Sequence, residues 1–350
     1  MKDTNKKRFK LFDYQREGKG IGKMDLADPS GIKRFFVSLK DNFGKIVSVN
    51  MFFVIGNFPL LFLIITLSGY TKLPTILPFS DLFQNVNGLL SINGATPYMM
   101  SLYGVEGLQN VVLVNTPLTY VFYGISALTL LTFGIVNVVT AYILRNLAKG
   151  EPVFVWADFW YAVKRNWKQA IPFGMIDAFL NFLFIYNIYT AFTQTSDFLG
   201  SMLFWCYIIL FVLYFFVRSY IYVQMVTFRL SVFKIFKNSL IFALLGFKRN
   251  FGAFFGTLLM IALEFLFMFG AGSILVPFAV AMPLTVFFSI SAYMKVFASY
   301  YKIKEVMIDP YLAEHPEEAQ ENYEDAEVIM RDDVTEKRRL EEIKKRNGIS

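Results

Sequence analysis

The chain contains almost none of the side chains on which most enzymatic and metal sites depend. Its 350 residues include a single cysteine, Cys206, and a single histidine, His315, which lies in a polar segment. One cysteine excludes an intrachain disulfide and a multi-cysteine metal site. One histidine leaves no histidine zinc site and no basis for Ser-His-Asp or Cys-His chemistry. We therefore expect a protein that is not an enzyme and that carries no metal or cofactor.

Charged residues are scarce as well. They make up 17% of the chain, whereas hydrophobic residues make up 55% and aromatic residues 18%. An average soluble domain has about 25% charged residues. A water-facing surface cannot be built from so few charges when the apolar residues form long runs, so the composition predicts a polytopic membrane protein. The net charge of +7 raises the question of a nucleic-acid partner, which the location of the charges answers.

Six apolar runs are long enough to cross a hydrocarbon core of about 30 Å, which takes about 20 helical residues. They cover residues 46–67, 119–143, 170–191, 200–226, 251–272 and 275–298. The predicted fold is all-α, a polytopic membrane helical bundle of about six transmembrane helices. The last two runs are separated only by a Gly/Ser/Pro turn around residues 270–277, so five spans is the alternative.

Lysine and arginine residues are distributed unevenly between the two sides of these runs. Residues 1–45 carry 12 of the 34, whereas residues 69–118 carry only Lys72. The other connections alternate between several basic residues and none. Because positive residues mark the cytoplasmic side of a membrane, both termini are predicted to be cytoplasmic. The same pattern places the positive charge along one membrane face, where its partner is membrane lipid and not nucleic acid.

This distribution divides the chain into three parts. Residues 1–45 form a basic N-terminal segment with an interfacial helix, residues 46–304 the six-helix transmembrane domain, and residues 305–350 a charged, partly disordered cytoplasmic tail. Residues 69–118 form an external loop, which is either an ordered cap on the helix ends or a docking surface for an external partner or solute. The tail is either a solvated, solubilising segment or a site of partner recognition.

A five-residue pattern recurs before the first, third and fifth apolar runs: apolar, Lys, charged, Asn, aromatic. It covers residues 39–43, 163–167 and 247–251. We expect the lysine at the level of the lipid headgroups, the aromatic ring at the interface, and the asparagine as the cap of the helix that enters the bilayer. The residues concerned are Lys40, Asn42 and Phe43; Lys164, Asn166 and Trp167; and Lys248, Asn250 and Phe251.

The residues just upstream of each pattern are amphipathic. Apolar side chains recur at i, i+3, i+4 and i+7 over residues 156–167, and similar faces precede the first run at 32–39 and the fifth run at 232–240. Helices of this kind lie in the plane of the membrane. We therefore expect three units, each an interfacial amphipathic helix followed by a transmembrane hairpin. The alternative is coincidence, because any positive-inside connection has a similar composition.

The stretch from residue 145 to residue 170 carries a denser pattern. A basic-Gly-Glu step, an Asp-Phe-aromatic step and a basic-x-Asn-aromatic-Lys-Gln ending follow one another. Together they resemble the signature of the bacterial YesL-like membrane proteins, a family of unknown function, and the similarity extends from about residue 10 to residue 300. The matching residues are Lys149, Gly150, Glu151, Asp158, Phe159, Trp160, Lys164, Asn166, Trp167, Lys168 and Gln169.

The resemblance implies a multi-pass protein in the cytoplasmic membrane of Gram-positive-type bacteria, in a genomic setting near carbohydrate uptake and degradation systems. It implies no catalytic residues. The chain departs from the shortest family members at residues 69–118, where those members have a short connection. Together these features predict an accessory or interaction component of carbohydrate uptake and utilisation, with transporter subunits or a solute-binding protein as partners.

Three ionisable residues inside the apolar runs are candidates for function: Asp177, Arg218 and Glu264. Charges within a membrane are costly, so they are functional candidates by default. The helical rise of about 1.5 Å per residue places them at overlapping depths, and we expect Arg218 to pair with one or both acids. They are either a structural ion pair that holds the third to fifth runs together, or the solute or proton site of a small secondary transporter or channel.

Overall fold

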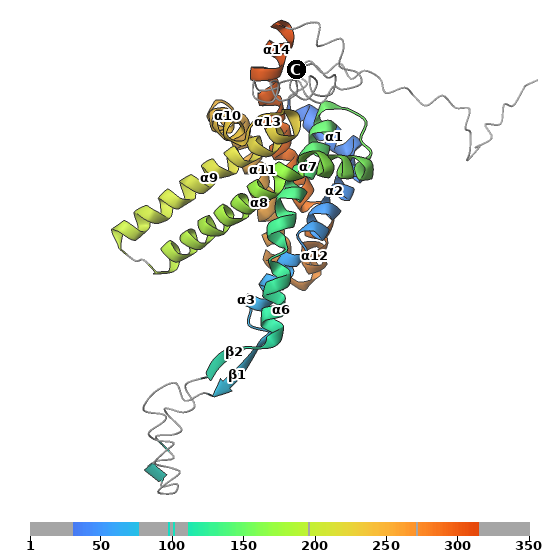
Figure 1. Cartoon of the computed structure of the whole chain (residues 1–350). Coiled ribbons are helices and arrows are strands. Elements are labelled where there is room, and N and C mark those ends of the chain that lie inside the picture. Colours follow the sequence, from blue (N-terminus) through green and yellow to red (C-terminus); the bar gives the residue numbers. More distant parts are fainter. Residues whose placement is uncertain are drawn as a thin grey trace, which may run out of the picture.

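The described residues form a bundle of long apolar helices in the computed structural model of the chain (Figure 1). The structure describes residues 31–76, 97–98, 101, 111–194, 197–270 and 272–314. The helices are α1 (Ile32–Asp41), α2 (Phe43–Gly56), α3 (Pro59–Leu67), α6 (Pro117–Ser126), α7 (Thr129–Lys149), α8 (Val155–Gln194), α9 (Phe198–Thr227), α10 (Val232–Leu245), α11 (Phe247–Phe265), α12 (Val276–Thr285), α13 (Phe287–Ile303) and α14 (Asp309–Glu314). The all-α prediction is confirmed.

Four helical segments are each long and apolar enough to cross a membrane. They are Pro117–Lys149, Val155–Thr193, Phe198–Thr227 and Phe247–Gly270. Two further segments reach the required length only as bent pairs, α2 with α3 at 53° and α12 with α13 at 50°. The described part of the chain therefore has four segments that are long and apolar enough to cross a membrane, or six when each bent pair is one span.

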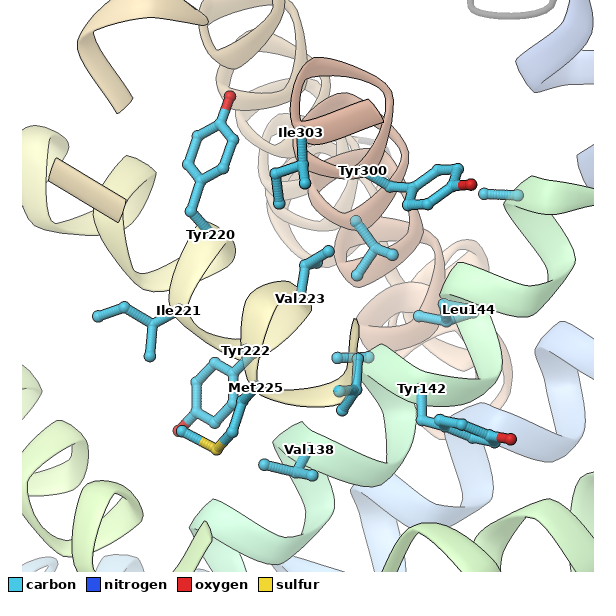
Figure 2. Packing of buried hydrophobic residues seen from close by; sticks show 14 of the residues in the cluster. Val138, Tyr142, Leu144, Tyr220, Ile221, Tyr222, Val223, Met225, Tyr300 and Ile303 are labelled. Carbon is cyan, nitrogen blue, oxygen red and sulfur yellow. The ribbon is translucent and has the colours of Figure 1, made fainter. Parts of the chain in front are cut away.

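The core lies where α7, the second half of α9 and α13 pack together. Helix α7 is buried almost all round over its second half, and α9 is buried over most of its length from Phe216 onward. A helix that is apolar on every side must be enclosed by other helices or by lipid. Figure 2 shows this cluster, with side chains from α7 (Val138, Tyr142, Leu144), α9 (Tyr220, Ile221, Tyr222, Val223, Met225) and α13 (Tyr300, Ile303).

The α8–α9 hairpin leaves this core and projects away from α3 and α6 (Figure 1). From residue 178 to residue 193 of α8 the only residue described as buried is Ala191, and in the first half of α9 the only one is Gly200. The outer part of the hairpin is therefore packed mainly on itself. Its other sides expose apolar residues, as lipid-facing helices do.

Two of the three predicted elbows are breaks between helices, and the third is not. Helix α1 ends at Asp41 before α2 begins at Phe43, and α10 ends at Leu245 before α11 begins at Phe247. The separate interfacial helix expected over 156–167 is instead the first part of α8, which runs unbroken to Gln194. A glycine lies within two residues of each real break, whereas residues 155–171 contain neither glycine nor proline to interrupt the helix.

The asparagines of the elbows do not cap the helices that follow them. Neither Asn42 nor any other side chain makes a capping hydrogen bond at the start of α2 or α11. Instead, Asn42 Nδ2 donates to the Ser38 carbonyl at 3.1 Å, and Asn250 Nδ2 donates to the Ala243 carbonyl at 2.8 Å. Each amide therefore bonds a carbonyl near the end of the preceding helix, and the Ser38 carbonyl also accepts the backbone N–H of Asn42 at 3.1 Å. The expected capping direction was reversed.

The equivalent asparagine of α8, Asn166, lies within a continuous helix. Its Nδ2 donates to the Ala162 carbonyl four residues earlier, at 3.1 Å. Lys164 and Trp167 beside it are both exposed. Phe251 of the third elbow is also half-buried, and it packs on Phe216 and Phe247. The remaining elbow side chains, Lys40, Phe43 and Lys248, are exposed.

A short antiparallel ribbon follows α3 and precedes α6. Strand β1 (Lys72–Ile76) pairs with β2 (Val111–Asn115), with Lys72 opposite Asn115. The hydroxyls of Thr116 and Thr119 donate to the Thr71 carbonyl at 2.7 and 2.8 Å and fix the ribbon to the start of α6. These strands were not predicted. The cap and the docking surface considered for this loop concern residues that lie mostly outside the described ranges.

Helical structure continues after α13, beyond residue 304, the expected end of the transmembrane domain. A π-helical segment, η3 (Lys304–Ile308), leads into α14, which ends at Glu314. The first part of the predicted tail is thus helical. The charged helix expected near the C-terminus lies outside the described residues.

Candidate functional site

A pocket of about 580 Å³ lies among α2, α3, α7, α8, α9, α11, α12 and α13. This volume is in the usual range of small-molecule sites, roughly 300–1,000 Å³. Most of its lining is apolar, with aromatic rings from α2, α7, α9 and α13. The polar side chains among the lining residues are Asn57, Asn137, Thr140, Asn181, Arg218, Ser219, Tyr222, Thr257, Ser291 and Lys295.

Asp177 is the centre of a hydrogen-bond network behind one wall of this pocket. The residue is completely buried, and Arg218 Nε donates to its two carboxylate oxygens at 2.7 and 2.8 Å. The hydroxyls of Tyr214 and Tyr222 donate to the same carboxylate at 2.6 and 2.5 Å, and Asn181 Nδ2 donates at 2.8 Å. The expected pairing of Arg218 with Asp177 is present. The carboxylate thus accepts hydrogen bonds from one cation and three neutral side chains, and Arg218, Tyr222 and Asn181 among them also line the pocket.

A close crossing of α7 and α8 positions two of the groups that hold Arg218. A Cβ atom at Gly174 would lie 2.2 Å from the Gly134 Cα atom, so only glycines allow this approach. Asn137 and Asp177 each follow their glycine by three residues and therefore lie one turn along the same helix face. Both bind Arg218, since Asn137 Oδ1 accepts from its Nη2 at 3.1 Å.

The guanidinium of Arg218 also faces the pocket. Its Cζ lies 5.4 Å from the ring centroid of Phe133 and 5.3 Å from that of Tyr222, which are both lining residues. Only Nε and Nη2 make hydrogen bonds within the described residues. A guanidinium carries five N–H donors, so part of its donor capacity is available to a ligand.

Lys295 of α13 is a second cation in the pocket, with a different environment. Its Nζ lies 5.1 Å from the ring centroid of Phe215, and it makes no hydrogen bond or ion pair in the part of the chain that the structure describes. Phe215 precedes Arg218 by three residues on α9. The ring that Lys295 contacts and Arg218 therefore lie about one helical turn apart. The hydroxyls of Ser219 and Ser299 are 2.9 Å apart and join α9 to α13 beside them.

Two further polar atoms at the pocket have no hydrogen-bond partner among the described residues. They are Asn57 Oδ1 and Ser291 Oγ. The Nδ2 of Asn57 is used locally, where it donates to the Phe53 carbonyl at 2.9 Å. Buried polar groups are normally paired, so the two atoms are available to hydrogen-bond a polar ligand.

Glu264 is not part of the pocket. It lies on the same stripe of α11 as Thr257 and Ile261, which line the pocket, but it is not among the lining residues. Its Oε2 makes no hydrogen bond within the described residues, and Arg218 pairs with Asp177 alone. Of the three candidate charges, the structure thus brings two together and leaves Glu264 apart.

The residues of the family-like signature form the connection from α7 to α8 and the start of α8, away from the pocket. Gly150 ends α7 with a positive φ of 83°, a conformation that favours glycine. Glu151 pairs with Lys149 at 2.7 Å, and Asp158 Oδ2 accepts from the backbone N–H of Phe154 at 2.9 Å, as a helix-capping carboxylate does. These contacts give the signature a structural role.

The aromatic residues of the signature either pack on α2 or are exposed. Phe159 packs against Phe52 with ring centroids 4.4 Å apart, whereas Trp160 is exposed. Lys168 Nζ lies 5.8 Å from the ring centroid of Trp167, and both side chains are exposed. None of these residues lines the pocket.

Lys295 was not included among the ionisable residues inside the apolar runs, although it lies within the predicted run 275–298. It was counted with the basic residues at the end of that run, because its neighbours Lys302 and Lys304 follow closely. The position of Lys295, three residues before the end of the run, was the available signal. Asn137 and Asn181 carried no signal of their own, since their role depends on the crossing of α7, α8 and α9.

No group of three His, Cys, Asp or Glu side chains within the described ranges is placed to hold a metal ion. Comparison with known proteins adds no identification, because no family model, no curated protein and no solved structure matches the chain.

Proposed function

We propose that this chain acts without catalysis, by binding a solute in the pocket that holds Arg218 and Lys295, and that it serves as a small secondary transporter or channel. The observation that carries the proposal is Lys295, which lines the pocket within the apolar run 275–298 and makes no hydrogen bond or ion pair in the described residues. Placing a charge inside a membrane-spanning segment is energetically costly, so an ionisable residue there is a candidate for ligand or ion binding. A structural ion pair explains Asp177 and Arg218, but it does not explain Lys295.

The two bent helix pairs support the proposal. Both breaks lie at the pocket, with Asn57 and Phe58 lining it at the first and Leu284 and Phe287 at the second. Membrane transporters commonly build their binding sites from interrupted helices, because irregular backbone is tolerated only where it lines a cavity or is buried in protein. The break in α12–α13 is supported by Asn50, which bonds the Pro283 carbonyl and the Ser289 N–H.

Cysteine accessibility tests the proposal without knowledge of the solute. A Thr257→Cys substitution in a Cys206→Ser background places one thiol in the pocket, and Thr257 bonds only the Ala253 carbonyl of its own helix. A transporter or channel exposes this thiol to a membrane-impermeant reagent from each face of oriented vesicles. The parent protein is the control, because Cys206 is exposed on the outer part of α9 and is expected to face lipid. Labelling of the Thr257→Cys variant from neither face would overturn the proposal.

We further propose that the protein lies in a bacterial cytoplasmic membrane with both termini inside, on the basis of its Lys and Arg distribution. In the same Cys206→Ser background, Asn115→Cys in β2 is expected to label from outside intact cells, and Glu314→Cys at the end of α14 only after permeabilisation. The reverse pattern would overturn the orientation.

A second candidate is the accessory role in carbohydrate uptake that the YesL-like resemblance implies. The outer part of the α8–α9 hairpin favours it, because this part exposes apolar residues of both helices over most of its length. Transporter subunits or a solute-binding protein are the proposed partners. Crosslinking in native membranes from a residue such as Phe182 or Trp205, followed by mass spectrometry, tests this role. Recovery of transporter subunits supports it, and crosslinks to lipid alone contradict it.

A further inference from the structure

We infer that the pocket takes an amphiphile with an anionic head group, a carboxylate or a phosphate, and an alkyl tail. The head group lies between Lys295 and Arg218, and the tail leaves through the side of the pocket formed by α3 and α12. This inference rests on the proposed solute-binding function and adds the chemical class of the solute.

The charge of the pocket selects an anion. Arg218 and Lys295 both line it, whereas Asp177, the acid that pairs with Arg218, is completely buried behind the wall. In the described part of the chain no acidic residue lines the pocket, so the lining carries two cations and a ligand meets an excess positive charge. An anion placed there pairs with Lys295 and accepts from the unused donors of Arg218.

The apolar side of the pocket selects an alkyl chain. Leu61 and Ile64 of α3 and Leu284 of α12 line the pocket, and yet they are 49%, 56% and 50% exposed. Side chains that both line a cavity and remain exposed mark its opening. Because α3 and α12 belong to membrane-crossing pairs, this opening faces the hydrocarbon region. A chain of methylene groups in that opening stays in apolar surroundings along its whole length.

The distribution of polar groups over the lining favours an amphiphile over a free sugar. A sugar needs a donor or acceptor near each hydroxyl, since an unpaired polar group in apolar surroundings is costly. Polar side chains from α7, α8, α9, α11 and α13 line one part of the pocket, whereas the α3–α12 side is lined by Leu, Ile and Pro side chains that offer a hydroxyl no partner. One polar head and one apolar tail match this division.

Binding measurements on the full chain in nanodiscs of neutral lipid, read by native mass spectrometry, test the inference. Three probes separate the features of the ligand: dodecyl phosphate carries anion and tail, inorganic phosphate carries the anion alone, and dodecyl maltoside carries the tail with a neutral head. We expect dodecyl phosphate to bind and the other two to compete weakly. Lys295→Met is expected to lower the affinity for dodecyl phosphate at least tenfold.

Lys302→Met is the matched control, because it removes the same charge from the same helix but outside the pocket, where Lys302 pairs with Glu305. It is expected to leave the affinity unchanged. Lys295→Met should fold normally, since Lys295 makes no hydrogen bond within the described residues and methionine has a similar length.

The outcomes separate the inference from the function on which it rests. Equal competition by inorganic phosphate, or equal binding of dodecyl maltoside, overturns the amphiphile and leaves solute binding intact. Equal loss of affinity in Lys295→Met and Lys302→Met also overturns it, because the effect is then one of net charge. If no probe binds but the Thr257→Cys variant is labelled from both faces, only the ligand class is overturned. If no probe binds and that variant is labelled from neither face, the proposed function is overturned as well.

Discussion

The two walls of the pocket are built on opposite principles. The wall formed by α7, α8 and α9 consists of unbroken helices, of which α7 and α8 cross at glycines and α8 and α9 are joined by a buried ion pair. The wall formed by α2–α3 and α12–α13 consists of helices that break at the pocket and expose apolar residues beside it. The first wall holds one cation firmly in place, and the second offers a way in. Rigidity and access are thus assigned to different helices.

The largest effect is expected from breaking the rigid wall at its centre. Asp177→Ala leaves Arg218 as an unpaired charge in the bundle, and loss of one partner of a buried pair costs roughly 3–5 kcal/mol. We expect a large drop in the thermal denaturation temperature in neutral detergent. The double variant Asp177→Leu with Arg218→Met should recover most of the stability, because it leaves no unpaired charge. An unchanged denaturation temperature in Asp177→Ala would show that the two walls do not differ in this way.

The glycine crossing is the next strongest determinant of the rigid wall. In Gly174→Ala the new methyl group meets the Gly134 backbone at 2.2 Å, so α7 and α8 must move apart. Overpacking of this kind costs about 1–3 kcal/mol, and the shift should also weaken the Asn137–Arg218 contact. Gly252→Ala in α11 is the matched control, since nothing lies within 4 Å of its Cβ position. Equal effects of the two substitutions on thermal denaturation would contradict the crossing.

The broken wall depends on Asn50, which is completely buried. Its side chain bonds the Pro283 carbonyl at 2.8 Å and the Ser289 N–H at 3.0 Å, two backbone groups on either side of the break. Asn50→Leu should cost roughly 1–2 kcal/mol, because both groups lose this partner. Asn187→Leu is the control, as its amide bonds only the Leu183 carbonyl of its own helix. A stable Asn50→Leu variant would show that the break does not need this bridge.

The smallest effect is expected outside both walls, at Glu305. The hydrogen bond from Lys302, together with the positive charges of Lys302 and Arg249, lowers the pKa of this carboxyl below its ordinary value. A lowered pKa in the folded state means that the contribution is present at neutral pH and is lost as the pH falls through the folded pKa. Glu305 is half-exposed, so Glu305→Gln should change the stability by no more than about 0.5 kcal/mol at pH 7. A larger loss in thermal denaturation would place a structural determinant at this end of the bundle.

The helical membrane architecture could be predicted because it depends on local composition. Runs of about 20 apolar residues must be helical in a bilayer, where no water satisfies the backbone. The breaks at residues 42 and 246 lie in or next to two of the predicted elbows, which were recognised by their local pattern of apolar, Lys, charged, Asn and aromatic residues. Residues 156–167 have the same amphipathic pattern and yet continue into α8, because amphipathicity specifies a face and not an end. The strand pair β1–β2 was missed because its hydrogen bonds join segments that are far apart in the sequence.

The site was predictable only in part. Asp177 and Arg218 were identified because charges are rare inside apolar runs, and their pairing followed from similar depths. Lys295 satisfied the same criterion, but its closeness to other basic residues at the end of the run concealed it. Glu264 satisfied it too and lies outside the pocket, although it shares a stripe of α11 with Thr257 and Ile261, because the extent of the pocket along that helix depends on how several helices pack.

Composition and charge position were enough to specify a polytopic helical bundle and to identify Asp177, Arg218 and Glu264 as charges inside its apolar segments, although Lys295 was missed. Those properties belong to single helices, whose length and polarity govern whether they can enter a bilayer. The packing of the helices was needed to establish that Asp177 neutralises Arg218, that Lys295 has no such partner in the described residues, and that two broken helices open the pocket beside them. These features depend on where glycines let backbones approach and on how separate helices rotate against one another, which no local pattern encodes.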